Sequence, residues 1–392
     1  MAGTGRWARG NPALGWGLSR RALLQAAGAG GAVMALAACG AGSGDGAEGD
    51  GAEALSWSNW PGYIDLDQDT GSSATLTAFE KQSGRPVRYT EDINDNEEFF
   101  AKVRIPLESG QSIGRDLVVL SEWMASRWIR LGYAQAFSPG AVPGKDNVNP
   151  RLVELAADPG LQHSVPWQGG FGGLGWNTEL LKEATGKTEL TSLDELWAPE
   201  LKGRVSVLSE MHDTLGLIML WQGKDPAVFT DDDFAAANAE LDQQIANGQI
   251  RQVTGNDYLT SLESGDLVAS MGWSGDVLGL GDGYGFGLPE SGGTLWVDTC
   301  LIPAGAAHKA DAEALLDYYC QPEVAAQVAA SVRYLCPIQG AQEAMRTVDP
   351  ASADDPWIFP PAEVLAGASV FRTLTDEEQD RYNRVFQKTI GN

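Results

Sequence analysis

One short, wholly apolar segment restricts the possible folds most. Residues 117–120 read Leu-Val-Val-Leu and follow Asp116 directly. A run this short, without polar alternation, is typical of a strand that is buried on both faces of a parallel sheet. Strands and helices alternate around it: we expect strands at 55–57 and 86–90, and helices at 76–83, at 96–108 with an interruption near Pro106, and at 122–131. This order predicts an α/β fold built in layers.

A second unit follows a long connection. The connection, 138–161, is rich in Pro, Gly and Asn, which favour turns and loops. After it the alternation returns, and we expect strands at 162–177, 205–208, 268–273 and 299–302 and helices at 214–222, 231–247, 310–320, 323–330 and 376–389. Two such units within 392 residues indicate a bilobed protein.

The N-terminal segment has the pattern of an export signal. Arg20 and Arg21 precede an uncharged stretch, 22–38, which ends in Leu-Ala-Ala before Cys39. This pattern is typical of a twin-arginine signal peptide, and its end resembles a lipobox, in which the cysteine is lipidated and becomes the new N-terminus. A transmembrane anchor is the alternative, but the stretch has 17 residues and a span needs about 20. We expect a signal peptide at 1–38, a flexible tether at 39–54, and an extracytoplasmic, periplasmic-type protein held on the outer face of the cell membrane by lipidated Cys39.

Three cysteines, Cys300, Cys320 and Cys336, remain once Cys39 is lipidated. In an oxidising compartment one pair would form a disulfide and leave one free thiol, and the sequence does not choose among the three pairings. Three buried thiols are the alternative. No CxxC or Cys/His spacing suggests a metal, so we expect neither a metal nor a cofactor.

The net charge of the chain restricts the classes of partner that it can bind. There are 53 acidic and 27 basic residues, which gives a net charge of −26. Such an excess argues against a nucleic-acid partner, whose phosphates it would repel. The excess of acidic residues is compatible with binding of a cationic small molecule. Alternatively, it only keeps the protein soluble.

Several short motifs, taken together and in order, carry a resemblance. They are Trp57-Ser-Asn-Trp60-Pro-Gly-Tyr63, Thr75–Gly84, Asp116–Ser121, Pro199–Gly203, Gly272–Asp276, Trp296–Asp298, Ile302–Ala304 and Tyr334. Over residues 55–345 this set resembles the spermidine/putrescine-binding proteins of ABC importers. The resemblance implies an α/β, two-lobed, type II periplasmic-binding fold with a ligand cleft between the lobes. It places one lobe at 55–162 and 286–331 and the other at 163–285 and 332–392.

The resemblance also implies a binding site for a polyamine, an alkyl chain with ammonium groups at fixed separations. Recognition needs carboxylates for the ammonium groups and aromatic walls for the methylenes. Trp273 would stack on the alkyl chain and Asp276 would pair with an ammonium group, while Trp296 and Asp298 would supply a second wall and a second carboxylate. The implied ligand-binding residues are Trp60, Tyr63, Ser121, Trp123, Asp213, Trp273, Asp276, Trp296, Asp298 and Tyr334.

Structural roles remain as alternatives for several of these residues. One of Trp60 and Tyr63 would pack in the core instead of lining the cleft. Trp273 would then end a buried strand, and Asp276 would cap the next helix. Asp298 would be an exposed residue at a strand edge. At the first turn, Pro61 and Gly62 replace polar residues that some relatives carry, which bears on the preferred amine.

The segment 209–214 departs from the family pattern, in which acidic groups here meet a further ammonium group. Glu210 and Asp213 keep the i, i+3 spacing of one helical face, and we expect Asp213 to point into the cleft and Glu210 to be optional. Capping of the helix at 214–222 by Asp213 explains the pattern equally well. Glu122 is interpreted as a helix N-terminal charge rather than a ligand residue. The choice between spermidine and putrescine therefore stays open.

The function implied is that of a monomeric lipoprotein that captures spermidine or putrescine and delivers it to the permease subunits of an ABC transporter. A receptor for a sugar or another organic cation is the alternative. A glycosidase is a remote one, because His163, His212 and His308 lie in no nucleophile motif and we expect no enzyme.

Overall fold

The computed structural model describes residues 53–391 except 68, 156–157 and 367. The predicted signal peptide, Cys39 and the tether up to residue 52 lie outside the described residues. Within the described part, no helix is long and apolar enough to cross a membrane.

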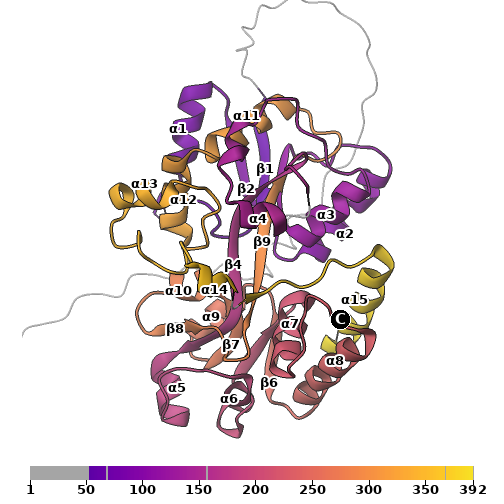
Figure 1. The fold of residues 1–392 in the computed structure, drawn as a ribbon, viewed down its shortest axis with the longest axis vertical. Coiled ribbons are helices and arrows are strands. Elements are labelled where there is room, and N and C mark those ends of the chain that lie inside the picture. The colour runs from indigo at the N-terminus through magenta and orange to yellow at the C-terminus, as the bar shows by residue number, and fades with distance from the viewer. Residues whose placement is uncertain (1–52, 68, 156–157, 367, 392) are drawn as a thin grey trace, which may run out of the picture. The chain divides into compact units, whose positions relative to one another are not determined.

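One sheet of ten strands organises the described residues (Figure 1). Its order is β2-β1-β3-β9-β4-β7-β5-β6, with β10 beside β9 and β8 beside β4. The strands are β1 (Leu55–Asn59), β2 (Val87–Glu91), β3 (Leu117–Ser121), β4 (Ser164–Asn177), β5 (Val205–Leu208), β6 (Ile250–Thr254), β7 (Ala269–Trp273), β8 (Tyr284–Gly287), β9 (Gly293–Leu301) and β10 (Ala368–Ser369). The apolar run at 117–120 forms β3 and is buried, as predicted.

The two lobes correspond to two parallel groups of strands. In one lobe β1 pairs in parallel with β2 and β3, and in the other β5 pairs in parallel with β6 and β7. The long strands β4 and β9 are antiparallel to each other and run between the two groups (Figure 1). This is the predicted two-lobed α/β fold, and the carboxyl ends of the parallel strands face its middle.

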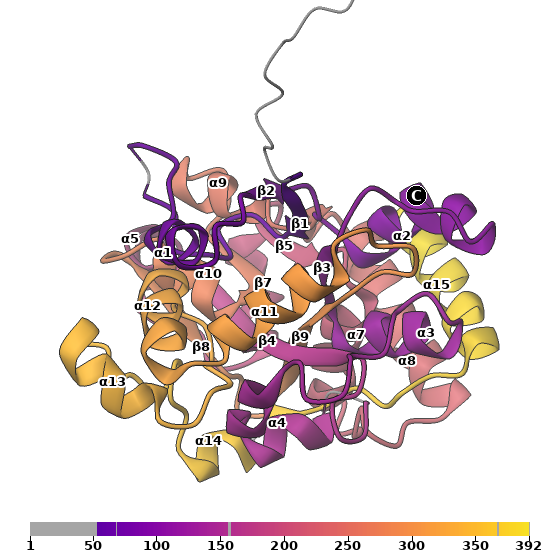
Figure 2. The same cartoon turned by 90° about the horizontal axis from the view of Figure 1, so that it is seen from above.

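Helices cover both faces of the sheet (Figure 2). Those of the first half are α1 (Ala74–Ser83), α2 (Asn96–Glu108), α3 (Glu122–Arg130), η1 (Pro143–Asn147), α4 (Pro150–Leu155), α5 (Thr178–Thr185), α6 (Leu193–Leu196) and η2 (Pro199–Leu201). Those of the second half are α7 (Met211–Trp221), α8 (Asp231–Ala246), α9 (Tyr258–Glu263), α10 (Ser274–Gly279), α11 (Lys309–Tyr319), α12 (Pro322–Val332), α13 (Ala341–Val348), α14 (Ala362–Ala366) and α15 (Asp376–Ile390).

Local chemistry explains where several helices begin and end. Ser73 caps α1 by accepting from the backbone N–H of Leu76, and Gly84 ends the helix with a φ of +71°, a conformation that suits glycine. Thr375 and Glu378 form a reciprocal capping box at the start of α15.

Three elements differ from the sequence-based expectation. Helix α2 continues through Pro106, because a proline two residues before the helix end removes only one hydrogen bond of the last turn. Helix α7 begins at Met211 rather than 214, so Asp213 lies inside its first turn and does not cap it. Strand β9 begins at Gly293 and joins the strand expected at 299–302 to the alternating segment Trp296–Asp298, which was also expected to be extended.

The helices in the last part of the chain pack against different neighbours. Helix α13 packs against α12, whereas α15 packs against α8 (Figure 1). The expected placement of 332–392 in one lobe stays a prediction. The other predicted boundaries stay proposals.

The three described cysteines, Cys300, Cys320 and Cys336, are free and buried. Burial raises the pKa of the Cys320 and Cys336 thiols to about 12. The alternative of three buried thiols therefore describes this structure. Among the described residues, no group of three or more His, Cys, Asp and Glu side chains is arranged to hold a metal ion.

Candidate ligand-binding site

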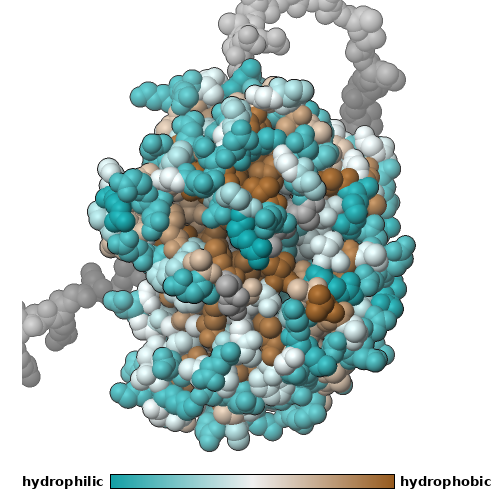
Figure 3. Space-filling model, in the orientation of Figure 1, coloured by the Kyte–Doolittle hydropathy of each residue, from teal (hydrophilic) through white to brown (hydrophobic). Residues whose placement is uncertain are grey.

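An open cavity lies where the two lobes meet, and the roughly 680 Å³ of empty space within it includes open solvent. Apolar residues on the face shown in Figure 3 gather across this middle region, whereas the periphery is mostly hydrophilic. The cavity brings together all ten residues that the sequence implied for ligand binding: Trp60, Tyr63, Ser121, Trp123, Asp213, Trp273, Asp276, Trp296, Asp298 and Tyr334. Eight further residues line it: Pro61, Glu122, Glu210, His212, Asn256, Thr294, Leu295 and Phe371.

Asp298 is held by two hydroxyl groups of its own lobe. Ser121 at the end of β3 faces Asp298 on β9 across the antiparallel ladder, and its Oγ donates to Oδ1 at 2.7 Å. The Tyr63 hydroxyl donates to Oδ2 at 2.8 Å. Burial, with the nearby carboxyls of Asp213 and Asp276, raises the pKa of Asp298 to about 7. Asp298 is 5% exposed, so the alternative of an exposed strand-edge residue is wrong.

Asp276 is held by side chains of the other lobe. Asn256 Nδ2 donates to its Oδ2 at 2.7 Å, and the Tyr258 hydroxyl approaches the same oxygen at 3.4 Å. Burial raises the pKa of Asp276 to about 6, and a hydrogen bond from Tyr334 opposes the shift. The carboxyl thus bonds to side chains and not to a helix N-terminus, so the capping alternative is wrong.

Asp213 points from the first turn of α7 into the cavity wall. The Trp273 indole N–H donates to its Oδ2 at 2.8 Å, and Thr294 Oγ1 donates to its Oδ1 at 2.6 Å. Burial raises the pKa of this carboxyl as well. Trp273 ends the buried strand β7, as its structural alternative stated, and it also lines the cavity.

Glu122 was interpreted only as a helix N-terminal charge, yet its side chain lines the cavity. Its Oε2 accepts from the backbone N–H of Val297 at 3.2 Å. Burial, followed by the charge of Asp298, raises its pKa to about 8. The signal in the sequence was its place beside Ser121, at the carboxyl end of a buried strand, where ligands of open α/β sheets bind.

Thr294, which was not predicted, and Glu210, which was left as optional, also line the cavity. Thr294 shares one strand face with Trp296 and Asp298, since alternate residues of a strand point the same way. Extending the predicted strand toward residue 293 would have found it. Glu210 accepts from Asn96 Nδ2 at 3.1 Å, and burial with the carboxyls of Asp95 and Asp213 raises its pKa.

The carboxyl groups of the cavity have no positive counterpart among the described residues that line it. Its five carboxyl groups are Glu122, Glu210, Asp213, Asp276 and Asp298, and no lysine or arginine among the described residues lines it. His212 does not compensate, because burial lowers its pKa to about 4 and leaves it neutral near pH 7. Hydroxyl, amide, indole and backbone donors hold these carboxyls. Such a cavity favours a cationic ligand, because buried charges are stable only when they are paired.

Aromatic rings form the remaining walls. Tyr334 makes edge contacts with both Tyr63 and Trp296, at ring-centroid distances of 5.4 and 5.2 Å. Trp123 contacts the ring of His212 at 4.6 Å, so the first and second lobes meet at the cavity edge. Rings of this kind pack on methylene groups and attract cations over their faces.

Residues 74–360 match the family described as bacterial extracellular solute-binding protein. The chain belongs to this family. This solute-binding protein is 29% identical over 325 residues to the putrescine-binding periplasmic protein PotF of Escherichia coli K12, covering 79% of this chain and 83% of that protein. It is 26% identical over 347 residues to the putrescine-binding periplasmic protein SpuD of Pseudomonas aeruginosa, covering 84% of this chain and 90% of that protein. These relatives are solute-binding proteins and not enzymes.

Solved structures share the fold of this solute-binding protein. A putative spermidine/putrescine ABC transporter protein from Listeria monocytogenes superposes with a TM-score of 0.73 at 22% identity, over 86% of this chain and 98% of that one. The lipoprotein Tp0655 of Treponema pallidum gives a TM-score of 0.70 at 20% identity, over 86% and 99%. Identity this low supports the two-lobed fold alone.

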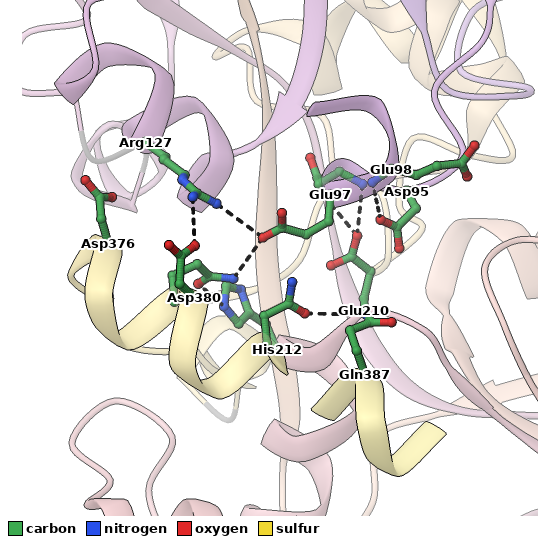
Figure 4. Close-up of polar contacts among 12 residues, drawn as sticks. Asp95, Glu97, Glu98, Arg127, Glu210, His212, Asp376, Asp380 and Gln387 are labelled. Carbon is green, nitrogen blue, oxygen red and sulfur yellow. Dashed lines mark hydrogen bonds and ion pairs between the residues drawn. The ribbon is translucent and has the colours of Figure 1, made fainter. Parts of the chain in front are cut away.

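Polar contacts join the two lobes of this solute-binding protein beside the cavity (Figure 4). Arg127 on α3 pairs with Glu97 on α2 at 3.4 Å and with Asp380 on α15 at 2.9 Å. Gln379 on α15 donates to Glu97 at 3.4 Å, and its Oε1 lies 3.2 Å from His212 Nε2. Because His212 lines the cavity, this network connects the cavity wall to the helices that hold the lobes together.

Proposed function

We propose that this solute-binding protein captures a polyamine, spermidine or putrescine, in the cavity between its lobes and delivers it to the permease of an ABC transporter. The observation that carries the proposal is the uncompensated charge of the cavity: five carboxyls and no basic side chain among the described residues that line it. The names of the relatives, which include putrescine-binding and spermidine/putrescine-binding proteins, support the same class of ligand.

The chemistry of a polyamine fits the two kinds of wall. Each ammonium group paired with a carboxylate contributes about 1.5–3 kcal/mol, and a cation over an aromatic face roughly 0.5–2 kcal/mol. The methylenes between the ammonium groups pack on Trp273 and Trp296. Asp213, Asp276 and Asp298 supply the carboxylates, and Trp60, Tyr63, Ser121, Trp123 and Tyr334 complete the proposed ligand-binding set.

The proposal also covers where the protein is anchored and how it delivers the ligand to the permease. A lipid on Cys39, after removal of residues 1–38, anchors a single copy outside the membrane, and residues 39–54 allow it to reach the permease. Closure of the lobes around the ligand buries the ion pairs and marks the loaded form. No covalent step is involved.

The alternative ligand is a sugar or another organic cation, and no contact of the described residues favours it over a polyamine. A neutral sugar would leave the five carboxyls of the cavity without counter-charges. A glycosidase is not supported either, because the relatives bind solutes.

Isothermal titration calorimetry tests the proposal. Putrescine and spermidine are titrated into the purified protein, with maltotriose as the neutral comparison. We expect saturable binding of an amine and at least about tenfold weaker binding in D276N. The matched control is E179Q, an exposed first-turn residue of α5. Binding of maltotriose without binding of either amine would overturn the proposal.

A further inference from the structure

A chain of hydrogen bonds connects the cavity wall to the boundary between the lobes. Asp298 accepts from Ser121 Oγ at 2.7 Å, and the same Oγ accepts from Asn96 Nδ2 at 3.0 Å. Asn96 Nδ2 also donates to Glu210 Oε1 at 3.1 Å, and the backbone N–H of Asn96 donates to this oxygen at 3.4 Å. These four residues, Asp298, Ser121, Asn96 and Glu210, form the interlobe chain.

The interlobe chain contains residues of both lobes. Asn96 begins α2 and Ser121 ends β3, so both belong to the first lobe. Glu210 lies directly before α7 and follows β5 of the second lobe. Figure 4 shows its side chain pointing toward the start of α2, where Asp95 lies. The bond between Asn96 and Glu210 therefore exists only while the lobes are together.

Asn96 uses both the acceptor and the donor of its side-chain amide. Its Oδ1 accepts from the backbone N–H of Ser121 at 3.2 Å, while the two hydrogens of Nδ2 reach Ser121 Oγ and Glu210. Because Asn96 donates to the Ser121 hydroxyl oxygen, the hydroxyl hydrogen is left for Asp298. Asn96 is 1% exposed and does not line the cavity, so it acts on a ligand only through its neighbours.

Glu210 serves Asn96 as an acceptor, and this role needs no charge. Its Oε1 accepts both bonds from Asn96, and the oxygen of a neutral carboxyl or an amide would accept the same bonds. Burial, followed by the carboxyls of Asp95 and Asp213, raises the pKa of Glu210, which favours the neutral form. Glu210 thus fits a contact between the lobes better than a partner for a further ammonium group.

We propose that Asn96 is a positioning residue that couples the orientation of Asp298 to closure of the lobes, with Glu210 as its acceptor on the second lobe. Opening of the lobes breaks the bond to Glu210 and loosens the amide that holds Ser121. Closure restores this bond and directs the Ser121 hydroxyl to Asp298 when the ligand is enclosed. This inference rests on the proposed function, since it assumes that the cavity binds polyamines. It adds the residue that joins ligand binding to closure.

Calorimetry and stopped-flow tryptophan fluorescence test the inference with putrescine and spermidine. The proteins are the wild type, E210Q, E210M, N96A, the double variant N96A/E210M and the control E179Q. Glutamine keeps the acceptor oxygen of Glu210 without its charge, whereas methionine keeps the volume but not the acceptor. We expect E210Q to bind within about twofold of the wild type, and E210M and N96A to bind at least about fivefold more weakly through faster release. The double variant should bind within about threefold of N96A, because both substitutions remove the same bond.

The outcomes separate the inference from the proposed function. Unchanged affinity in E210M, or equal weakening in E210Q and E210M, overturns the role of Glu210 as an acceptor. Unchanged affinity in folded N96A, or a loss in the double variant that equals the product of the two single losses, overturns the coupling through Asn96. Melting temperatures verify folding, and if N96A does not fold, the comparison of E210Q with E210M decides. If the wild type binds neither amine, the proposed function itself fails.

Discussion

The indole N–H of Trp273 donates a hydrogen bond of 2.8 Å to Oδ2 of Asp213. This bond links β7 to α7, and Thr294 on β9 holds the other carboxylate oxygen at 2.6 Å. The ring and the carboxyl that were predicted as separate ligand contacts therefore form one unit. Its geometry is set before a ligand arrives, so little entropy is lost when an ammonium group binds there.

Replacement of Asp213 by asparagine should weaken polyamine binding about tenfold to a hundredfold. The change removes a buried negative charge, and the amide nitrogen of the new asparagine faces one of the two donors, Trp273 or Thr294. Calorimetry measures the affinity, and D232N, an acidic residue in the exposed first turn of α8, is the matched control. Unchanged affinity in D213N would remove Asp213 from the site.

Local patterns predicted the fold well where they were strong. The apolar run of β3 and the helical spacing of α15 are examples, because both patterns reflect burial of residues that lie close together in the sequence. The alternation of Trp296 and Asp298 predicted a strand there, but the start of β9 at 293–295 was not predicted, because Thr294 turns a polar side chain toward the cavity. Glu122 does lie in the first turn of α3, as predicted, but its place in the cavity wall was not predicted, because its partner Val297 is far along the chain and only the sheet brings them together.

Polyamine affinity should rise with pH between about 5.5 and 8. The pKa of Asp276 is raised to about 6 and that of Asp298 to about 7, so each carboxyl must release a proton before it pairs with an ammonium group. His212 does not contribute, because its pKa is lowered to about 4. Calorimetry at pH 6.5 in two buffers of different ionisation enthalpy measures the protons released. Binding to D298N should release fewer protons than binding to the wild type. A pH-independent affinity would contradict the assignment of Asp276 and Asp298 as the carboxyls that pair with the ligand.

The ligand-free protein should lose stability as the pH rises through the same range. A carboxyl whose folded pKa is raised, such as Asp298 or Glu122, stabilises the fold fully below about pH 4 and loses this contribution as the pH rises through about 7 or 8. Each proton contributes a slope of about 1.4 kcal/mol per pH unit. Urea unfolding from pH 5 to 8 measures the slope, which D298N should reduce. Carboxyls with a lowered pKa, such as Glu378, stay ionised over this range. Stability that increased with pH would contradict this prediction.

The thiols of Cys300, Cys320 and Cys336 should resist alkylation in the folded protein. All three are buried, and burial raises their pKa well above its ordinary value, so almost no thiolate is present at pH 7.5. Peptide mapping after iodoacetamide treatment should find these positions unmodified in the native protein and modified after unfolding in guanidinium. The unfolded sample is the control. A pair that stays unmodified in the unfolded, unreduced sample would reveal a disulfide.

Replacement of Gln379 by methionine should weaken polyamine binding about threefold to thirtyfold, mainly by faster release. Gln379 is buried and joins the lobes through Glu97 and His212, and methionine keeps its volume but makes neither bond. Because Gln379 does not line the cavity, the effect comes from a smaller closed population, which lowers the apparent affinity in proportion. Stopped-flow tryptophan fluorescence measures release, and Q243M, at an exposed position of α8, is the matched control. Equal release rates in Q379M and Q243M would show that these contacts do not hold the lobes closed.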